Sequence, residues 1–188
     1  TDSDTVVLLN WLIAKGESGI SQLDGMFAFC FVNRNTKKML LVRDHIGEKT
    51  VFYSYRNSNS DGAYEFAFSS EINSLLAVKW IDRSLNQSAL QNYLKFLYTP
   101  APDTLYKGVK ELEPGQILKI DINESSILCD YFYNLVDRIA VNHDLDYSSA
   151  VSGFSEKFHH SIKLRLQSDV PLGVYLSGGM DSNAIAAA

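Results

Sequence analysis

The sequence predicts an α/β protein in two parts: a β-rich domain over residues 1–122 and the start of a doubly wound α/β domain over residues 147–188. Two observations predict this division. The segment Leu23–Val32 is apolar on both faces, as expected for a strand that is covered on both sides. Towards the carboxyl end, an amphipathic segment, a short apolar run and a Ser-Gly-Gly turn precede a new helix start. The hydrophobic period fades over residues 123–146, which form the predicted linker.

The β-rich part begins with a predicted helix over residues 3–15, which Gly16 closes as a carboxyl-terminal breaker. Asn86 is the expected cap of a later helix that runs to Leu97, and Pro100–Pro102 predicts an extended link. The remaining expected elements are strands at 23–32, 39–42, 51–55, 64–68 and 116–122, a polar connector at 57–62 and a helix at 69–78.

The second part begins with apolar residues at helical spacing, namely Val151, Phe154, Phe158, Ile162 and Leu166. Pro171 is expected to end that helix, and the apolar run 174–176 is expected to be a strand. The order of helix, strand, glycine loop and helix is typical of the first elements of a nucleotide-binding layer.

The glycine loop carries the clearest chemical signal. Gly178 and Gly179 let the backbone approach a ligand closely, and the helix that follows directs its amide groups and dipole at an anion. Ser177 and Ser182 add hydroxyl donors, and Asp181 can hold a divalent cation against phosphate oxygens. A Gly-Lys-Ser/Thr motif is absent, so the loop favours the pyrophosphate of ATP in an AMP-forming reaction. The alternative is an ordinary turn followed by an ordinary helix start.

The composition of the chain argues against several classes of function. The 188 residues are 46% hydrophobic, and 17 basic against 22 acidic residues give a formal net charge of −5, which argues against a dedicated nucleic-acid binder. No segment has the pattern of a membrane span or a signal peptide. The two cysteines, Cys30 and Cys129, have neither metal spacing nor close pairing, so we expect reduced thiols in the cytoplasm, with Cys30 packing inside a strand.

The first helix has nothing before it and the last is an Ala-rich stub, so we expect the sequence to be truncated at both ends. Across the chain, several motifs in the same order resemble the glutamine-hydrolysing asparagine synthetases. They are Ser3-Asp-Thr5, Leu23-Asp-Gly-Met-Phe-Ala-Phe29, Arg43-Asp-His-Ile-Gly47, Phe68-Ser-Ser-Glu-Ile72, Pro100-Ala-Pro102, Pro114-Gly115 and the segment from Ser168 to Ser182. β-Lactam synthetases and amidotransferases that act on bacterial surface sugars share this pattern.

The resemblance implies a two-site enzyme. Its first domain would be a class II glutamine amidotransferase with the αββα sandwich of N-terminal-nucleophile hydrolases, in which an N-terminal cysteine attacks the glutamine amide. Ammonia would pass through an apolar channel to a synthetase domain. There ATP and aspartate would form a β-aspartyl-adenylate with the help of Mg²⁺, and ammonia would displace AMP to give asparagine. The implied partners are glutamine, aspartate and ATP, without nucleic acid or membrane, and a homodimer is a possible assembly.

The resemblance assigns few residues. Asp4 matches the aspartate that binds the α-amino group of glutamine, with helix capping as its alternative role. Met26 matches a position that lines the ammonia channel. The alternative, which is the commoner role of a methionine, is that it packs in the hydrophobic core. The residues that match the ATP and pyrophosphate site are Tyr175, Leu176, Ser177, Gly178, Gly179, Asp181 and Ser182, with Asp181 as the expected Mg²⁺ ligand.

Other matching residues have expected structural roles: Arg43 and Asp44 as a loop-fixing ion pair, and Glu71 as a helix-start charge. The nucleophilic cysteine and the Arg, Asn and Glu of the family's glutamine pocket are expected upstream of Thr1, so no catalytic residue is assigned. The later Asp and Lys residues of the synthetase domain are expected beyond Ala188. The sequence departs from the family at four positions: Val6 for Glu, Thr50 for Pro, Met180 for Leu and Asn183 for Ser or Thr.

The isolated chain is therefore expected to be inactive, because neither site is complete. Two alternatives stay open. One is an amidotransferase of the same build that acts on another carboxylate, such as a surface sugar acid. The other is a non-catalytic binding module, against which the complete 177–182 loop argues.

Overall fold

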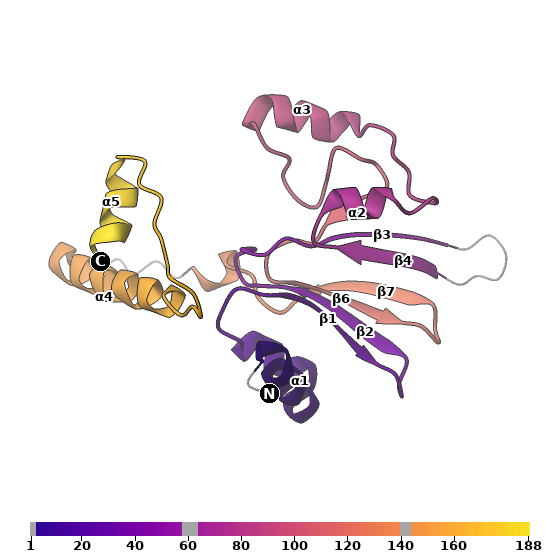
Figure 1. The fold of residues 1–188 in the computed structure, drawn as a ribbon, viewed down its shortest axis with the longest axis horizontal. Coiled ribbons are helices and arrows are strands. Elements are labelled where there is room, and N and C mark those ends of the chain that lie inside the picture. Colours follow the sequence, from indigo (N-terminus) through magenta and orange to yellow (C-terminus); the bar gives the residue numbers. More distant parts are fainter. Residues whose placement is uncertain (1–2, 58–63, 140–143) are drawn as a thin grey trace. The chain divides into compact units, whose positions relative to one another are not determined.

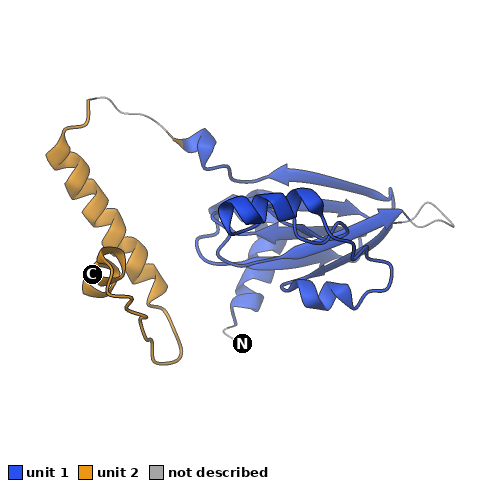
Figure 2. Cartoon of the chain, turned by 90° about the horizontal axis from the view of Figure 1, so that it is seen from above, with its two compact units in different colours: residues 1–138 blue, residues 139–188 orange. Residues whose placement is uncertain are grey.

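The structure, a computed structural model, describes residues 3–57, 64–139 and 144–188, and the polar connector expected at 57–62 lies largely outside them. The chain divides into two compact units, residues 1–138 and residues 139–188, which are coloured separately in Figure 2. Among the described residues no helix is long and apolar enough to cross a membrane.

Two antiparallel sheets form the first unit (Figure 1). Its strands are β1 (Ala28–Asn33), β2 (Lys38–Arg43), β3 (Phe52–Asn57), β4 (Tyr64–Ser69), β5 (Lys110–Glu111), β6 (Gln116–Asp121) and β7 (Ser126–Tyr131). The four-stranded sheet has the order β1-β2-β6-β7, and the three-stranded sheet has the order β4-β3-β5. Its helices are α1 (Asp4–Lys15), α2 (Ile72–Leu76), α3 (Gln87–Phe96) and the 3₁₀ turns η1 (Gly16–Gln22) and η2 (Val136–Arg138).

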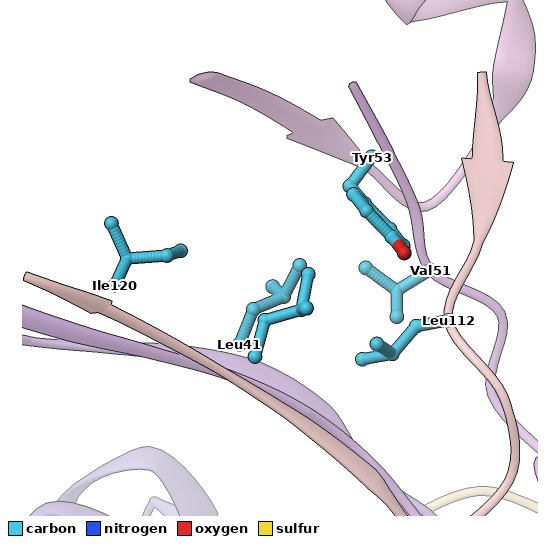
Figure 3. Packing of buried hydrophobic residues seen from close by; sticks show 6 residues of the cluster. Leu41, Val51, Tyr53, Leu112 and Ile120 are labelled. Atoms are coloured by element: carbon cyan, nitrogen blue, oxygen red, sulfur yellow. The ribbon is translucent and has the colours of Figure 1, made fainter. Parts of the chain in front are cut away.

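The core between the two sheets follows from the alternation of side chains along each strand. Leu41 of β2 and Leu118 of β6 point from the four-stranded sheet towards Tyr53 of β3. Figure 3 shows Leu41 and Ile120 on one side of this layer and Tyr53, Val51 and Leu112 on the other.

Helices cover the outer faces of both sheets. Val42 and Ile117, the neighbours of the inward-pointing residues, pack against Leu12 of α1 and Ile20 of η1. On the three-stranded sheet, α2 and the segment 78–82 cover the outer face, in a cluster centred on Leu75, Ile81 and Val109. The first unit is thus a four-layer αββα sandwich, as expected from the resemblance. The strand that contains Phe29 and Cys30 contributes to a core on each face, as its apolar pattern predicts.

Several predicted boundaries need correction. The strand predicted at 23–32 begins at Ala28, because η1 and a loop occupy residues 16–27. The helix predicted at 69–78 is the shorter α2. The Pro100–Pro102 segment is a turn with a cis Ala101–Pro102 peptide instead of an extended link.

The largest difference lies in the predicted linker. Residues 126–131 form β7, which pairs with β6 along its whole length from Gln116↔Tyr131 to Asp121↔Ser126. The first unit consequently extends to Arg138, and residues 123–138 of the expected linker belong to it. Most residues of β7 are exposed, so this strand needs few apolar side chains, which explains the faded hydrophobic period.

The second unit contains α4 (Tyr147–Arg165) and α5 (Met180–Ala187). The Asp146 carboxylate caps α4 by accepting the Ser149 N–H at 3.0 Å. The helix ends at Arg165, so Pro171 does not end it. The strand expected at 174–176 is wrong as well, because these residues have no regular structure. A strand needs a neighbouring strand to pair with through hydrogen bonds, and the described part of this unit contains no strand.

Candidate functional site

The Ser-Gly-Gly loop lies directly before α5, as the sequence predicts. Gly178 has a φ of 79°, a left-handed conformation that glycine adopts without strain. Gly179 is the N-cap residue of α5, and the Asn183 N–H donates to its carbonyl at 3.2 Å. The backbone therefore turns sharply and presents the free amide groups of the first helical turn to solvent.

Two serine hydroxyls hold the loop together. The Oγ atoms of Ser177 and Ser182 lie 3.1 Å apart, so one donates to the other across the turn. Ser182 Oγ donates its single hydrogen to the carbonyl oxygen of Gly179 at 3.0 Å, so Ser177 Oγ is the donor in the contact between the two hydroxyls. The loop thereby gathers two hydroxyls at the amino end of α5, where the helix dipole favours an anion.

Asp181 is placed in the first turn of α5 and is exposed. Within the described ranges, no group of three or more His, Cys, Asp and Glu side chains is arranged to hold a metal ion. Mg²⁺ at nucleotide sites is commonly held by one or two carboxylates with phosphate oxygens and water completing the shell. A single carboxylate beside two hydroxyls fits this shared coordination and does not fit an all-protein cage.

Tyr175 and Leu176 precede the loop and are exposed, Tyr175 completely. In the second unit as described, no residue is buried. The structure therefore brings Ser177, Gly179 and Ser182 together, whereas it does not gather Tyr175 or Leu176 around a nucleotide pocket.

The expected glutamine-site residues lie in the first unit. Asp4 is the first residue of α1 and is exposed, and Ser3 is the N-cap residue, so Asp4 contributes charge to the first turn instead of capping it. Met26 lies in the loop before β1 and is 46% exposed, which contradicts the alternative of a core methionine. The glutamine and channel roles of these two residues stay predictions.

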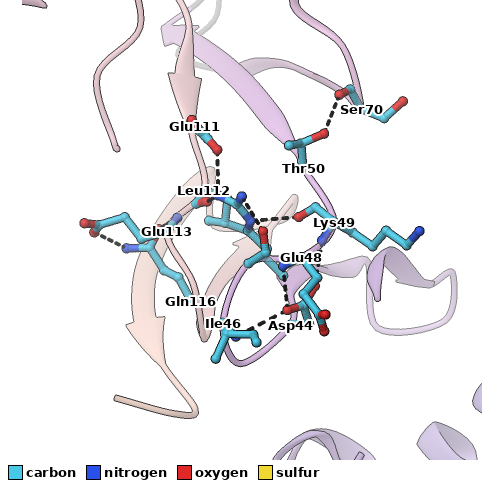
Figure 4. Close-up of polar contacts among 12 residues, drawn as sticks. Asp44, Ile46, Glu48, Lys49, Thr50, Ser70, Glu111, Leu112, Glu113 and Gln116 are labelled. Carbon is cyan, nitrogen blue, oxygen red and sulfur yellow. Dashed lines mark hydrogen bonds and ion pairs between the residues drawn. The ribbon is translucent and has the colours of Figure 1, made fainter. Parts of the chain in front are cut away.

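The Arg43-Asp44 motif forms a buried polar network that organises the loop after β2 (Figure 4). The fully buried Asp44 carboxylate accepts the N–H groups of Glu48 and Lys49, both at 2.9 Å, and that of Ile46 at 3.3 Å. Because these three partners are all backbone N–H groups, the Asp44 carboxylate holds the loop in place by accepting hydrogen bonds from its backbone.

Arg43 supplies the other half of this network. Its Nη1 atom forms an ion pair with Glu111 Oε1 at 2.8 Å, and its Nε and Nη2 donate to the carbonyls of Lys49 and Gly47. The loop-fixing role predicted for Arg43 and Asp44 is confirmed, but the ion pair joins Arg43 to Glu111 and not to Asp44. No local signal marks Glu111, which lies 68 residues further along the chain.

The aromatic residues that follow β7 pack against the loop after β2, within the first unit. The His45 ring lies 5.2 Å from the Phe132 ring and 4.7 Å from the Tyr133 ring, measured between centroids. Arg138 lies over the Tyr133 ring at 5.0 Å. Gly115 permits this approach, because a Cβ atom there would lie 2.1 Å from the Tyr133 carbonyl oxygen.

Neither cysteine has the surroundings of a nucleophile. Burial raises the pKa of the Cys30 thiol to about 11. Burial also raises the pKa of Cys129, with a further increase from the Glu113 charge. Both thiols therefore stay protonated near neutral pH, which agrees with the packing role predicted for Cys30.

Two stretches of the chain match known protein families. Residues 1–133 match the family described as glutamine amidotransferase domain, and residues 153–188 match the family described as asparagine synthase. The asparagine synthetase (glutamine-hydrolyzing) 1 of Bacillus subtilis strain 168 is 35% identical over 185 residues, which cover 98% of this chain and 28% of that protein.

Two further relatives also match nearly the whole of this chain over only part of their own length. A Methanocaldococcus jannaschii protein named, provisionally, asparagine synthetase (glutamine-hydrolyzing) 2 is 32% identical over 98% of this chain and 35% of its own length. The asparagine synthetase (glutamine-hydrolyzing) 3 of Bacillus subtilis is 30% identical over 98% of this chain and 28% of its own length. The chain thus spans about a third of the length of the curated relatives it matches. The αββα unit and the family match over residues 1–133 show that the chain belongs to the glutamine amidotransferase family, and the segment that follows, residues 153–188, matches the asparagine synthase family.

Proposed function

We propose that this chain is part of a glutamine-dependent asparagine synthetase, which uses ammonia from glutamine to convert aspartate and ATP into asparagine, AMP and pyrophosphate. The observation that carries the proposal is the 177–182 loop at the start of α5, within the segment that matches the asparagine synthase family. The names of the relatives support the same reaction for those proteins.

The chemistry requires an activated carboxylate, because a free carboxylate is a poor acceptor for ammonia. Transfer of the AMP moiety of ATP to aspartate supplies that activation and releases pyrophosphate, whose negative charge must be stabilised as it leaves. In this proposal the amide groups of the first turn of α5 and the hydroxyls of Ser177 and Ser182 donate to pyrophosphate oxygens. Mg²⁺, held in part by Asp181, would neutralise the remaining charge.

The amidotransferase unit has a different task. Asp4, exposed at the start of α1, would hold the α-amino group of glutamine, and Met26 would line the path of ammonia. Neither cysteine of this chain is activated as a nucleophile, because the pKa of Cys30 is raised to about 11 and that of the exposed Cys129 is also raised. We therefore place glutamine hydrolysis on a cysteine outside these 188 residues.

The acceptor is tested with the full-length product of the gene that encodes this chain. Purified enzyme is incubated with ATP, Mg²⁺ and glutamine, and AMP release is measured with aspartate or with other carboxylates, among them sugar acids. Release that depends on aspartate supports the proposal. Release that depends only on another carboxylate would replace asparagine synthesis by a different amidotransferase reaction, and no release with any carboxylate would favour a binding module.

The role of Asp181 is tested by Asp181→Ala in the same full-length enzyme. Loss of its carboxylate removes a Mg²⁺ contact, so we expect aspartate-dependent AMP release to fall by at least about a hundredfold, as for the loss of one strong transition-state contact. Glutamine hydrolysis should be retained. Glu156→Ala, an exposed carboxylate of α4, serves as the matched control and should leave both activities unchanged. Unchanged synthesis in Asp181→Ala would remove this residue from the site.

A further inference from the structure

A surface cavity of about 450 Å³ lies beside β3, in the first unit, and is separate from every residue discussed above as a site. Its volume is in the range of pockets that take small organic ligands. Its wall consists of Tyr53, Ser54, Tyr55 and Arg56 of β3, Trp80, Asp82, and Lys107, Gly108 and Lys110 from the segment that leads into β5. Aromatic rings and cationic groups therefore dominate the lining.

The cavity exists because β5 is short. Its two residues pair only with Phe52 and Tyr53, so the rest of β3 has no partner strand on this side in the described structure. The Leu112 N–H donates to the Val51 carbonyl, and peptide groups along a strand point to the same side at every second residue. The peptide groups of Tyr55 consequently face the open side and are available to a ligand.

The opposite wall is fixed by backbone contacts. The Gly108 N–H donates to the Asp82 carbonyl at 3.0 Å, and the Lys107 N–H donates to the Ser84 carbonyl at 3.0 Å. A Cβ atom at position 108 would lie 2.6 Å from the Asp82 backbone, so only glycine permits this contact. The wall is therefore preformed, which reduces the entropic cost of binding.

The charges of the lining differ in sign from those of the chain as a whole. Arg56, Lys107 and Lys110 face a single carboxylate, Asp82, in a chain with a formal net charge of −5. Arg56 is already engaged, because its guanidinium pairs with Glu65 and lies over the Trp80 ring at 5.3 Å. No ion pair engages the ammonium groups of Lys107 and Lys110 within the described ranges.

The Asp82 carboxylate accepts a hydrogen bond from Ser84 and forms no ion pair with a lysine among the described residues. Its pKa is lowered mainly by hydrogen bonds from the Ser84 backbone and hydroxyl, and only to a smaller extent by the Lys107 charge. The carboxylate is thus held by Ser84, whose N–H lies 2.8 Å from Asp82 Oδ1. A ligand anion can accordingly use the lysine ammonium groups.

We propose that this cavity binds a small anion that combines a phosphate group with a flat ring, the chemistry of a nucleoside monophosphate. The phosphate would bind the ammonium groups of Lys107 and Lys110. The ring would occupy the open edge of β3, between the half-buried Trp80 on the outer face of the sheet and Tyr55, which is 42% exposed, on the opposite face. The rival explanation is that the lysines only protect an open strand edge from pairing with another chain, which requires no ligand.

The experiment uses tryptophan fluorescence, because the sequence contains only two tryptophans. Trp80 lines the cavity, whereas Trp11 lies in α1 and donates to the Gly19 carbonyl. The 188-residue chain with Trp11→Phe reports on the cavity alone, and Trp80→Phe is its control. AMP is the probe, with adenosine and ribose 5-phosphate as probes that lack the phosphate or the ring. We expect a saturable change with AMP in Trp11→Phe, none in Trp80→Phe, and binding at least about tenfold weaker for either partial probe.

The second arm removes the two free cations. Lys107→Ala combined with Lys110→Ala should weaken AMP binding at least about tenfold, the usual effect of losing a charged hydrogen bond. The matched control combines Lys49→Ala with Lys157→Ala, two exposed lysines outside the cavity, and should bind AMP normally. Asp181→Ala should leave the Trp80 signal unchanged, which separates this cavity from the proposed ATP site. Absence of a saturable Trp80 response, or equal affinity in the double lysine variant, would overturn the proposal and leave the lysines as edge protection.

Discussion

At the scale of single residues, Asp44 shows how a motif can serve the architecture of a site without taking part in its chemistry. Its carboxylate is fully buried and gathers three backbone N–H groups, while the Gly115 N–H donates to its carbonyl at 2.8 Å. Two segments that are far apart in the sequence, the loop after β2 and the turn before β6, are joined through this one residue.

Asp44→Asn is therefore expected to destabilise the chain. The substitution replaces one acceptor oxygen by an amide nitrogen, which faces a backbone donor and leaves it without a partner. An unsatisfied buried donor costs about 1–3 kcal/mol, so the free energy of unfolding should fall by that amount in urea denaturation. Asp24→Asn, at an exposed loop position, is the control and should change stability by less than about 0.5 kcal/mol. Equal stability of Asp44→Asn and the parent chain would contradict the network.

A second prediction at this scale concerns pH. A hydrogen bond from the Lys119 ammonium, at 2.7 Å, is the main cause of the lowered pKa of Asp130. Because the pKa of Asp130 is lower in the folded chain than in the unfolded chain, its contribution to stability is present above about pH 4 and is lost as the pH falls further. The urea midpoint of the parent chain should thus fall more steeply between pH 5 and pH 2, taken as roughly the range of aspartate titration, than that of Asp130→Asn. Parallel pH profiles would show that the ion pair contributes nothing.

The sequence predicts those residues whose partners are close in the chain. Asn86 is an example, because its side chain accepts the Ala89 N–H three residues later, as a cap does. The Ser177–Ser182 contact is local in the same way. Glu111 could not be assigned, since its partner Arg43 is brought close only when β5 joins the other strands.

At the scale of elements, the alternation of side chains decides which strand residues stabilise the fold. Leu118 of β6 is 1% exposed and lies between the sheets, so Leu118→Ala should cost about 2–5 kcal/mol of unfolding free energy. Leu128 of the neighbouring β7 is 59% exposed, and Leu128→Ala should change stability by less than about 0.5 kcal/mol. Urea denaturation of both variants checks the pair. Similar losses would mean that Leu128 is covered in solution.

The exposure of β7 explains why the sequence did not predict this strand; the two-residue β5 was not predicted either. The residues of β7 alternate weakly, and most of them are exposed. A usable signal is present just before it, where the Asn123 and Glu124 N–H groups bond to Asp121 Oδ1 and form a turn typical of a hairpin. The opposite error at residues 174–176 has a related cause: an apolar run becomes a strand only when another strand pairs with it.

At the scale of the whole molecule, the two units differ in how much they bury. The first has three clusters of buried apolar residues, one between the sheets and one under each helical layer. In the second, no described residue is buried, and Phe154 and Phe158 stack on each other along α4 with Phe154 69% exposed. Helices without a packed face are marginally stable in water.

Hydrogen exchange should reveal this difference directly. Amide groups exchange when a segment opens, and the free energy of opening rises with the apolar area that the segment buries. We expect residues 147–188 to exchange faster than Phe27–Phe31, whose side chains pack against α1 and η1 or between the sheets. Mass spectrometry of peptides from the 188-residue chain, after exchange in deuterated buffer, measures both segments in one sample. Equal protection would mean that α4 and α5 are packed in solution. The loop at Ser177–Ser182 would then be more rigid than its exposed surroundings in the structure indicate.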